Sequence, residues 1–208
     1  MKVTSRKAFR VIKHILAEPE FSQREVARET GVGLGYVNEI VNYLVSIGVI
    51  YRKNHYALGD PVRLLEKVSF DRPLASLELD SFRMPTVSVA ETERVITETF
   101  EREGVDYAFT GFSGLRRYFE YHISYPKVHF YVPDGRRLVG LERGEGPVEV
   151  VALRADMGSI LEEIEIVQGV RVCGRVQVIV DLFSSGIGRD AAIRFLEAIR
   201  LGATRRVG

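Results

Sequence analysis

Residues 34–43 combine polar side chains with a spacing that puts them on one side of a helix. Gly35, Asn38, Glu39 and Asn42 follow the i, i+3, i+4, i+7 pattern. An asparagine amide can pair bidentately with adenine, and a glutamate carboxylate can accept a hydrogen bond from the amino group of cytosine. The side chains on this face therefore have the chemistry to read base edges.

The other face of the same segment is apolar, as a packed helix requires. Val37, Ile40, Val41 and Leu44 repeat with helical spacing, which predicts a helix over 34–47. The helix would bury these four side chains and leave the polar face outside.

Glycines mark the turn before this helix and the residue after it. Gly31 can take a left-handed conformation at the end of a preceding helix, and Gly48 can do so after residue 47. Gly33 and Gly35 keep the turn thin, so the helix over 34–47 can approach another surface closely.

Two further helices are predicted upstream. Ser22 and Glu25 form the capping box S-x-x-E of a helix that starts near Gln23 and ends by residue 31. Residues 5–17 place an apolar stripe beside a basic one. The basic stripe contains Arg6, Arg10 and Lys13. A basic start favours contact with a polyanion, although a solvated helix face explains this segment equally well.

The stretch VIYRKNHYALGD, residues 49–60, predicts two short strands with a turn near Lys53 and Asn54. Three helices followed by a hairpin, with a glycine-rich turn before the third helix, predict a winged helix-turn-helix. Residues 4–60 resemble the winged-helix domains of bacterial and archaeal transcription regulators. In such a domain the third helix enters the major groove and the hairpin, or wing, contacts the backbone.

The expected partner is double-stranded DNA, with base contacts from the third helix and charge from the first helix and the wing. The absence of Lys and Arg on the third helix favours the alternative, a winged helix that binds protein. The predicted DNA-contacting residues are Arg6, Arg10, Gln23, Leu34, Gly35, Tyr36, Asn38, Glu39, Asn42, Tyr43, Arg52, Lys53 and His55. One such helix reads few base pairs, so we expect a homodimer or paired binding on DNA.

The rest of the chain has a different pattern. Residues 61–85 contain three prolines and predict a short helix followed by an extended connector. From residue 86, helical patterns alternate with apolar strand patterns. Helices are predicted at 88–104, 114–122 and 188–201, strands at 106–111, 127–132, 148–153 and 172–183, and a turn at 133–135.

The segment YAFTGFSGLRRYF followed by KVHFYV resembles the start of a nucleotidyltransferase-like fold. In active members of that fold, the second strand carries two carboxylates, one residue apart, that hold Mg²⁺. The matching positions here are His129 and Tyr131, or Val128 and Phe130 on the other side of the strand. Neither pair suits a hard cation, so we expect no enzyme activity, no metal and no cofactor.

The segment VQVIVDLFSSGIGRDAAIRFLEAI, interpreted as strand, loop and helix, resembles the end of the C-terminal domain of AbiEi-type antitoxins. That family joins an N-terminal winged helix to a nucleotidyltransferase-like domain. The resemblance implies a transcription regulator that autoregulates a toxin–antitoxin operon, with a nucleotidyltransferase toxin as partner. A stand-alone regulator, a nucleotide-sensing regulator and an active nucleotidyltransferase are the alternatives.

Asp181 follows the apolar run VQVIV of the predicted strand over 172–183, where its carboxylate would be at least half buried. A lone buried carboxylate is costly, so we expect a structural role. Arg189, Arg116 and Arg117 are the candidate partners, together with backbone N–H groups of residues 184–188.

The remaining features exclude several classes of protein. A single cysteine, Cys173, permits no internal disulfide and lies in an apolar stretch where a buried side chain is expected. No apolar run is long enough to cross a bilayer, and no signal peptide is present, so a cytoplasmic location is expected. The chain is thus predicted to be α+β, with a winged helix-turn-helix at 1–60, a connector at 61–85 and a nucleotidyltransferase-like α/β sheet domain at 86–208.

Overall fold

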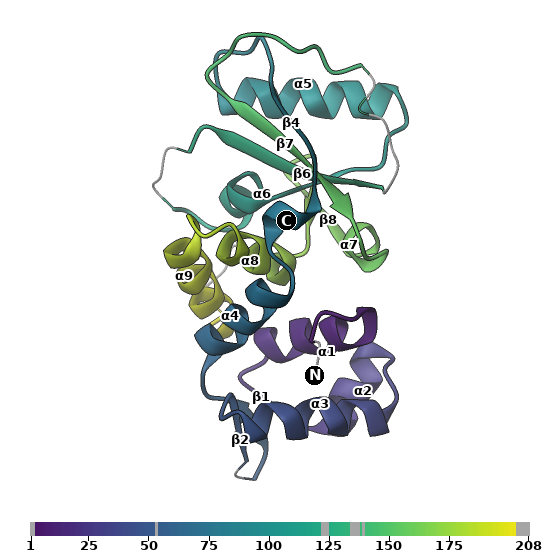
Figure 1. The fold of residues 1–208 in the computed structure, drawn as a ribbon, viewed down its shortest axis with the longest axis vertical. Coiled ribbons are helices and arrows are strands. Elements are labelled where there is room, and N and C mark those ends of the chain that lie inside the picture. The colour runs from purple at the N-terminus through teal and green to yellow at the C-terminus, as the bar shows by residue number, and fades with distance from the viewer. Residues whose placement is uncertain (1–2, 53, 122–124, 134–137, 139, 203–208) are drawn as a thin grey trace.

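The structure is a computed structural model that describes residues 3–52, 54–121, 125–133, 138 and 140–202 (Figure 1). It has an α+β fold in which N-terminal helices and a small antiparallel sheet precede a mixed six-stranded sheet with helices. Lys53 and His122, and the predicted turn beyond Pro133, lie outside the described residues.

The N-terminal region contains the three predicted helices and a three-stranded sheet. Its elements are α1 (Arg6–Ala17), β1 (Glu20–Phe21), α2 (Gln23–Thr30), α3 (Leu34–Ser46), β2 (Ile50–Arg52) and β3 (Tyr56–Leu58). The sheet has the order β1-β3-β2, and both pairings are antiparallel. β1 was not predicted, since two residues are too few to show a strand pattern.

Local chemistry places the ends of these helices as the sequence predicts. The Ser22 hydroxyl accepts a hydrogen bond from the Glu25 N–H, and Gly31 ends α2 with a φ of 65°. Gly48, with a φ of 71°, follows α3. The N-cap at Ser22 and both glycine stops are confirmed.

Residues 61–83 contain α4 (Pro61–Asp71), a short 3-10 helix η1 (Leu74–Leu77) and β4 (Glu78–Arg83). The short helix predicted here is confirmed as α4. The extended remainder is not simply a connector, because β4 pairs antiparallel with a strand of the large sheet. This segment therefore packs as part of the second region, which comprises the large sheet and the helices that cover it.

The large sheet has the strand order β4-β7-β6-β5-β9-β8. β6 runs parallel to β7 and β5 runs parallel to β9, and the other three pairings are antiparallel. Its remaining strands are β5 (Ala108–Thr110), β6 (Lys127–Pro133), β7 (Glu149–Ala155), β8 (Ile164–Val167) and β9 (Val170–Cys173).

Helices cover both faces of this sheet. They are α5 (Val89–Arg102), α6 (Gly111–Tyr118), α7 (Ser159–Glu162), α8 (Arg175–Ser184) and α9 (Arg189–Arg200). Ile96 and Phe100 of α5 pack on one face with Phe109, Phe130 and Val150. α6 and α8 lie against the other face, and α9 packs on α8 (Figure 1).

The core on the α8 side of the sheet continues without a break into the N-terminal helices. One cluster of buried side chains includes Phe9 and Ile12 of α1, Leu65 of α4 and Phe183 of α8. In Figure 1, α1 faces the second region and α3 lies beyond it. The N-terminal helices are thus packed onto the sheet region by shared apolar burial.

The strand predicted over 172–183 is wrong beyond residue 173. Residues 175–184 form α8, which buries most of its circumference between the sheet, α4, α6 and α9. A helix buried on nearly all sides is apolar all round, so its sequence resembles that of a buried strand. The other predicted strands and helices of the second region exist, with shorter bounds in several cases.

Candidate nucleic-acid interface and a buried polar network

The outer face of α3 is exposed and uncharged apart from Glu39. Gly35, Asn38, Glu39 and Asn42 are exposed, and Leu34 keeps 45% of its surface accessible. Val37, Ile40, Val41 and Leu44 are fully buried. The predicted division of α3 into an apolar and a polar face is confirmed.

Three amide side chains form a continuous chain across this face. Asn38 Oδ1 accepts hydrogen bonds from Gln23 Nε2 and Asn42 Nδ2, each at 3.0 Å. Gln23 Nε2 also lies 3.3 Å from the hydroxyl of Tyr56 on β3. These contacts link α2, α3 and the hairpin. Within this set of hydrogen bonds, Asn38 Nδ2 and Asn42 Oδ1 are not used.

The hairpin places one arginine beside this chain. Arg52 is exposed, and its guanidinium lies 5.5 Å from the centre of the Tyr56 ring. Tyr56 also stacks on Phe21 at 5.9 Å between ring centres. His55 is exposed in the same hairpin. Tyr56 thus supports both the arginine and Gln23, a role that the sequence prediction missed.

The basic residues of α1 do not all face the same way. The Ser5 hydroxyl lies 3.2 Å from the Tyr36 hydroxyl, so the start of α1, with Arg6, is next to α3. Arg10 Nη1 donates to the Thr30 carbonyl at 3.4 Å. Lys13 is 7% exposed and forms an ion pair with Glu163 of the second region.

The predicted residues therefore separate into two groups. The structure brings Gln23, Asn38 and Asn42 together and sets Arg52 beside them through Tyr56. It does not bring the whole basic stripe of α1 to this face, because Lys13 helps to dock α1 on the second region. Tyr43 is half-buried at the edge of α3.

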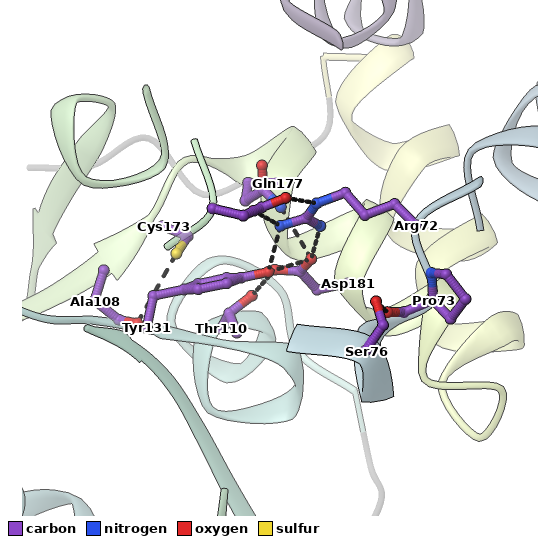
Figure 2. A network of polar contacts seen from close by, with 10 residues as sticks. Arg72, Pro73, Ser76, Ala108, Thr110, Tyr131, Cys173, Gln177 and Asp181 are labelled. Carbon is purple, nitrogen blue, oxygen red and sulfur yellow. Dashed lines mark hydrogen bonds and ion pairs between the residues drawn. The ribbon is translucent and has the colours of Figure 1, made fainter. Parts of the chain in front are cut away.

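A second polar assembly is buried in the interior and includes Arg72, Thr110, Tyr131, Gln177 and Asp181 (Figure 2). Asp181 is fully buried on α8 and accepts four side-chain hydrogen bonds. The donors are Thr110 Oγ1 at 2.6 Å, Gln177 Nε2 at 2.9 Å, the Tyr131 hydroxyl at 2.9 Å and Arg72 Nη1 at 3.4 Å. The carboxylate is therefore satisfied from every side, as a buried charge must be.

Arg72, which follows α4, links this carboxylate to a second one. Its guanidinium donates to both carboxylate oxygens of Asp156, at 2.7 and 3.1 Å, and to the Tyr131 hydroxyl at 3.1 Å. It also lies 5.4 Å from the centre of the Phe9 ring of α1. Arg72 is 4% exposed and contacts α1, α8 and the residue that follows β7.

The charges in this assembly depend on one another. Burial disfavours a charged guanidinium, but Tyr131, Asp156 and Asp181 more than offset it, so the pKa of Arg72 is raised. Burial raises the pKa of the Asp181 carboxyl, against the opposing effects of Arg72 and three hydrogen bonds. Removal of Arg72 would leave Asp181 buried without its counter-charge.

The partner predicted for Asp181 is wrong. Its arginine is Arg72, not Arg189, Arg116 or Arg117. Arg189 is exposed and lies over the ring of Phe183 at 4.8 Å, and Arg116 and Arg117 pair with Glu93. The predicted strand would have ended at the loop, whereas the α8 helix turns the carboxylate inward, away from Arg189.

The positions compared with metal-binding carboxylates hold an imidazole and a phenol. Tyr131 is engaged with Arg72 and Asp181, and burial lowers the pKa of His129 to about 4. Gly111, whose φ is 59°, begins α6 directly after β5 and packs against the His129 ring. Among the described residues, no three His, Cys, Asp or Glu side chains are grouped so as to hold a metal ion.

The chain matches no family model and no curated protein. Of the helices described, none is sufficiently long and apolar to cross a membrane.

Proposed function

We propose that this protein is a DNA-binding transcription regulator. Its N-terminal region is a winged helix-turn-helix in which α3 is the recognition helix and β2 and β3 form the wing. The observation that carries the proposal is the chain of three amides formed by Gln23 of α2 with the exposed Asn38 and Asn42 of α3.

The chemistry of that chain suits base edges. Asn38 Nδ2 and Asn42 Oδ1 supply a donor and an acceptor that the chain itself does not use. Base edges in the major groove offer both kinds of partner, and adenine presents an acceptor and a donor side by side. DNA would exchange with the internal hydrogen bonds at little cost, because Asn38 and Asn42 are exposed.

Phosphate binding would come from the arginines at the edges of this face. Arg52 lies on the wing, Arg24 is exposed on α2, and Arg6 follows the Ser5–Tyr36 contact. Lys13 is excluded from this role by its pairing with Glu163. Few cationic contacts mean modest affinity for a single copy, so we propose paired binding on DNA, as a homodimer or cooperatively.

The second region is proposed to be a catalytically silent nucleotidyltransferase-like domain. The support is that β5, the Gly111 turn, α6 and β6 follow one another as that fold requires. The guanidinium of Arg72 already pairs with the carboxylates of Asp156 and Asp181, and His129 and Tyr131 are poor ligands for Mg²⁺. We propose that the chain serves as the autoregulating antitoxin of a type IV toxin–antitoxin pair.

Selection from a random duplex DNA library tests the regulator proposal. The full chain should enrich one motif, and an inverted repeat of it is expected if two copies bind. Footprinting should then protect that site. Asn38→Ala should relax the preference of the enriched motif at one base pair, while Glu66→Gln, an exposed change on α4, should enrich the parent motif. Enrichment of no motif, or an unchanged motif with the Asn38 variant, would remove α3 from the groove and favour a protein-binding winged helix.

A further inference from the structure

We propose that a cavity between α4 and α9 binds an aliphatic carboxylate of the medium-chain fatty acid class. The cavity has a volume of about 380 Å³ and lies between the start of α4 and the end of α9 (Figure 1). Leu58, the last residue of β3, and Gly59 also line it. A ligand here would therefore contact both the N-terminal region and the second region, and its binding does not depend on the proposed binding of DNA.

Most of the cavity wall is aliphatic. Val62 and Leu65 come from α4, and Ile193, Leu196 and Leu201 come from α9 and the residue after it. Leu65 and Leu196 are 1% and 2% exposed, whereas Leu201 is 81% exposed and would be covered by a bound alkyl chain. No aromatic side chain is among the described residues that line the cavity, so the wall suits a flexible chain rather than a planar ring.

The lining also includes a cation whose charge is poorly balanced. Arg200, the last residue of α9, is half-buried, and its Nη2 atom donates to the Leu58 carbonyl at 3.4 Å. Its Nη1 atom is enclosed by protein without a hydrogen-bond partner. Burial lowers the pKa of the guanidinium, and among the described residues only Tyr51 opposes this effect. A carboxylate in the cavity would supply the missing counter-charge.

Glu197 is the other charged residue of the lining, and it competes weakly for this role. It is exposed on α9, where water and salt screen its charge. A cationic ligand would gain only this exposed carboxylate and would have to approach the half-buried guanidinium of Arg200. The two charged residues therefore favour an anion over a cation.

The size of the cavity sets the length of the ligand. A cavity of about 150 Å³ is enough to hold benzene, and this one is more than twice as large. A chain of roughly eight carbons with a terminal carboxylate fits that space. Each further methylene should tighten binding about fourfold until the chain fills the cavity.

Octanoate tests this site against two probes of the same length, each used below the concentration at which it forms micelles. Octanol lacks the charge, and octylammonium reverses it. In NMR titrations of the full protein, octanoate should give saturable shifts of amides around residues 58–65 and 193–201. Octanol should bind roughly tenfold more weakly, as expected for the loss of a hydrogen bond to a charged group. Octylammonium should show no saturation, and hexanoate should bind about tenfold more weakly than octanoate.

Variants of α9 connect that result to Arg200. Arg200→Gln should weaken octanoate roughly tenfold and leave it no tighter than octanol. Arg194→Gln makes the same change at an exposed position of the same helix, so it is the matched control and should bind like the parent. Arg200→Lys keeps the charge and should retain a preference for octanoate over octanol. Glu197→Gln should leave octanoate binding unchanged or tighter.

Three outcomes would overturn the proposal. The first is the absence of saturable binding of octanoate. The second is equal binding of octanol and octanoate to the parent protein, which would remove the charge argument. The third is an Arg200→Gln variant that prefers octanoate as strongly as Arg194→Gln does. The first two need only the parent protein, so they decide the matter even if Arg200→Gln does not fold.

Discussion

The outer face of α3 and the interior around Arg72 are both hydrogen-bonded polar assemblies, but they are built in opposite ways. On α3 the members are exposed amides without charge, and Asn38 and Asn42 keep groups that can take new partners. Around Arg72, buried charges are held by neutral donors, and Asp181 accepts hydrogen bonds from four side chains.

Under the proposed function, this difference separates a surface suited to recognition from an assembly suited to positioning. An exposed amide can exchange a protein partner for a base at low cost, since water already competes for it. A buried ion pair cannot exchange partners without stranding a charge. The contact of Arg72 with Phe9 suggests that the interior assembly fixes α1, and with it the face of α3, relative to the large sheet.

Arg72→Met is the variant with the largest expected effect, and it tests the buried half of this comparison. This change keeps apolar volume but leaves Asp181 buried without its counter-charge, so the free energy of unfolding should fall by about 3–5 kcal/mol. Urea denaturation followed by circular dichroism measures the change. Arg94→Met on α5, which removes an exposed i, i+4 pair with Glu98, is the control and should cost under about 1 kcal/mol.

An unchanged stability of Arg72→Met would contradict this prediction. If Arg72→Met is as stable as the control, the interior network is not what holds the two regions together. The double variant Arg72→Met with Asp181→Asn should recover part of the loss, since the stranded charge is then removed as well.

The second prediction concerns the pH dependence of stability. His129 has a pKa of about 4 in the folded protein against 6.5 for an ordinary histidine. Between these values the unfolded chain binds a proton that the folded chain does not, so stability is full above pH 6.5 and is lost as the pH falls toward 4. The loss from this residue should approach about 3 kcal/mol.

Comparison of three proteins isolates that contribution. The free energy of unfolding of the parent and of His129→Asn should be measured from pH 7.5 to 4. The parent should lose more stability than the variant over this interval. His55→Asn, a change in the exposed hairpin, should follow the parent. Parallel curves for the parent and His129→Asn would show that the buried imidazole already takes up its proton.

The N-terminal region could be predicted from sequence because its signals are local. The Ser22–Glu25 cap, the turn glycines and the helical repeat of Val37, Ile40 and Val41 each act within a few residues. The exposure of Asn38 and Asn42 follows from the same repeat. The support from Tyr56 could not be predicted, since it depends on how the hairpin packs on α2.

The interior network could not be predicted from such local signals. Arg72 lies 84 residues from Asp156 and 109 from Asp181, in a segment interpreted as a connector. Its partners are set by tertiary packing, and residues 175–184 form α8 rather than the strand from which the partners of Asp181 were predicted. The buried state of Asp181 was nevertheless predictable, because the residue interrupts an apolar run.

Asn38→Ala tests the recognition half of the comparison. We expect discrimination at one base pair to fall by about 1–3 kcal/mol, because the variant lacks the amide that reads it. Competition binding with single-base variants of the selected site measures this loss, and melting curves should show little change in stability. Uniform weakening on all sequences, with discrimination intact, would instead assign Asn38 to the phosphate backbone.

The smallest expected effect is that of Arg52→Gln on the wing. Arg52 is exposed and is held over the Tyr56 ring at 5.5 Å, so it can reach phosphate without first breaking an ion pair. One lost phosphate contact should reduce the slope of log K against log salt by about 0.9 and weaken all sequences equally. Fluorescence anisotropy at several salt concentrations measures the slope, with Arg102→Gln on α5 as the control. An unchanged slope with altered base preference would place Arg52 in a groove. The wing would then share base recognition with α3, and the exposed polar assembly that reads DNA would include the hairpin as well as that helix.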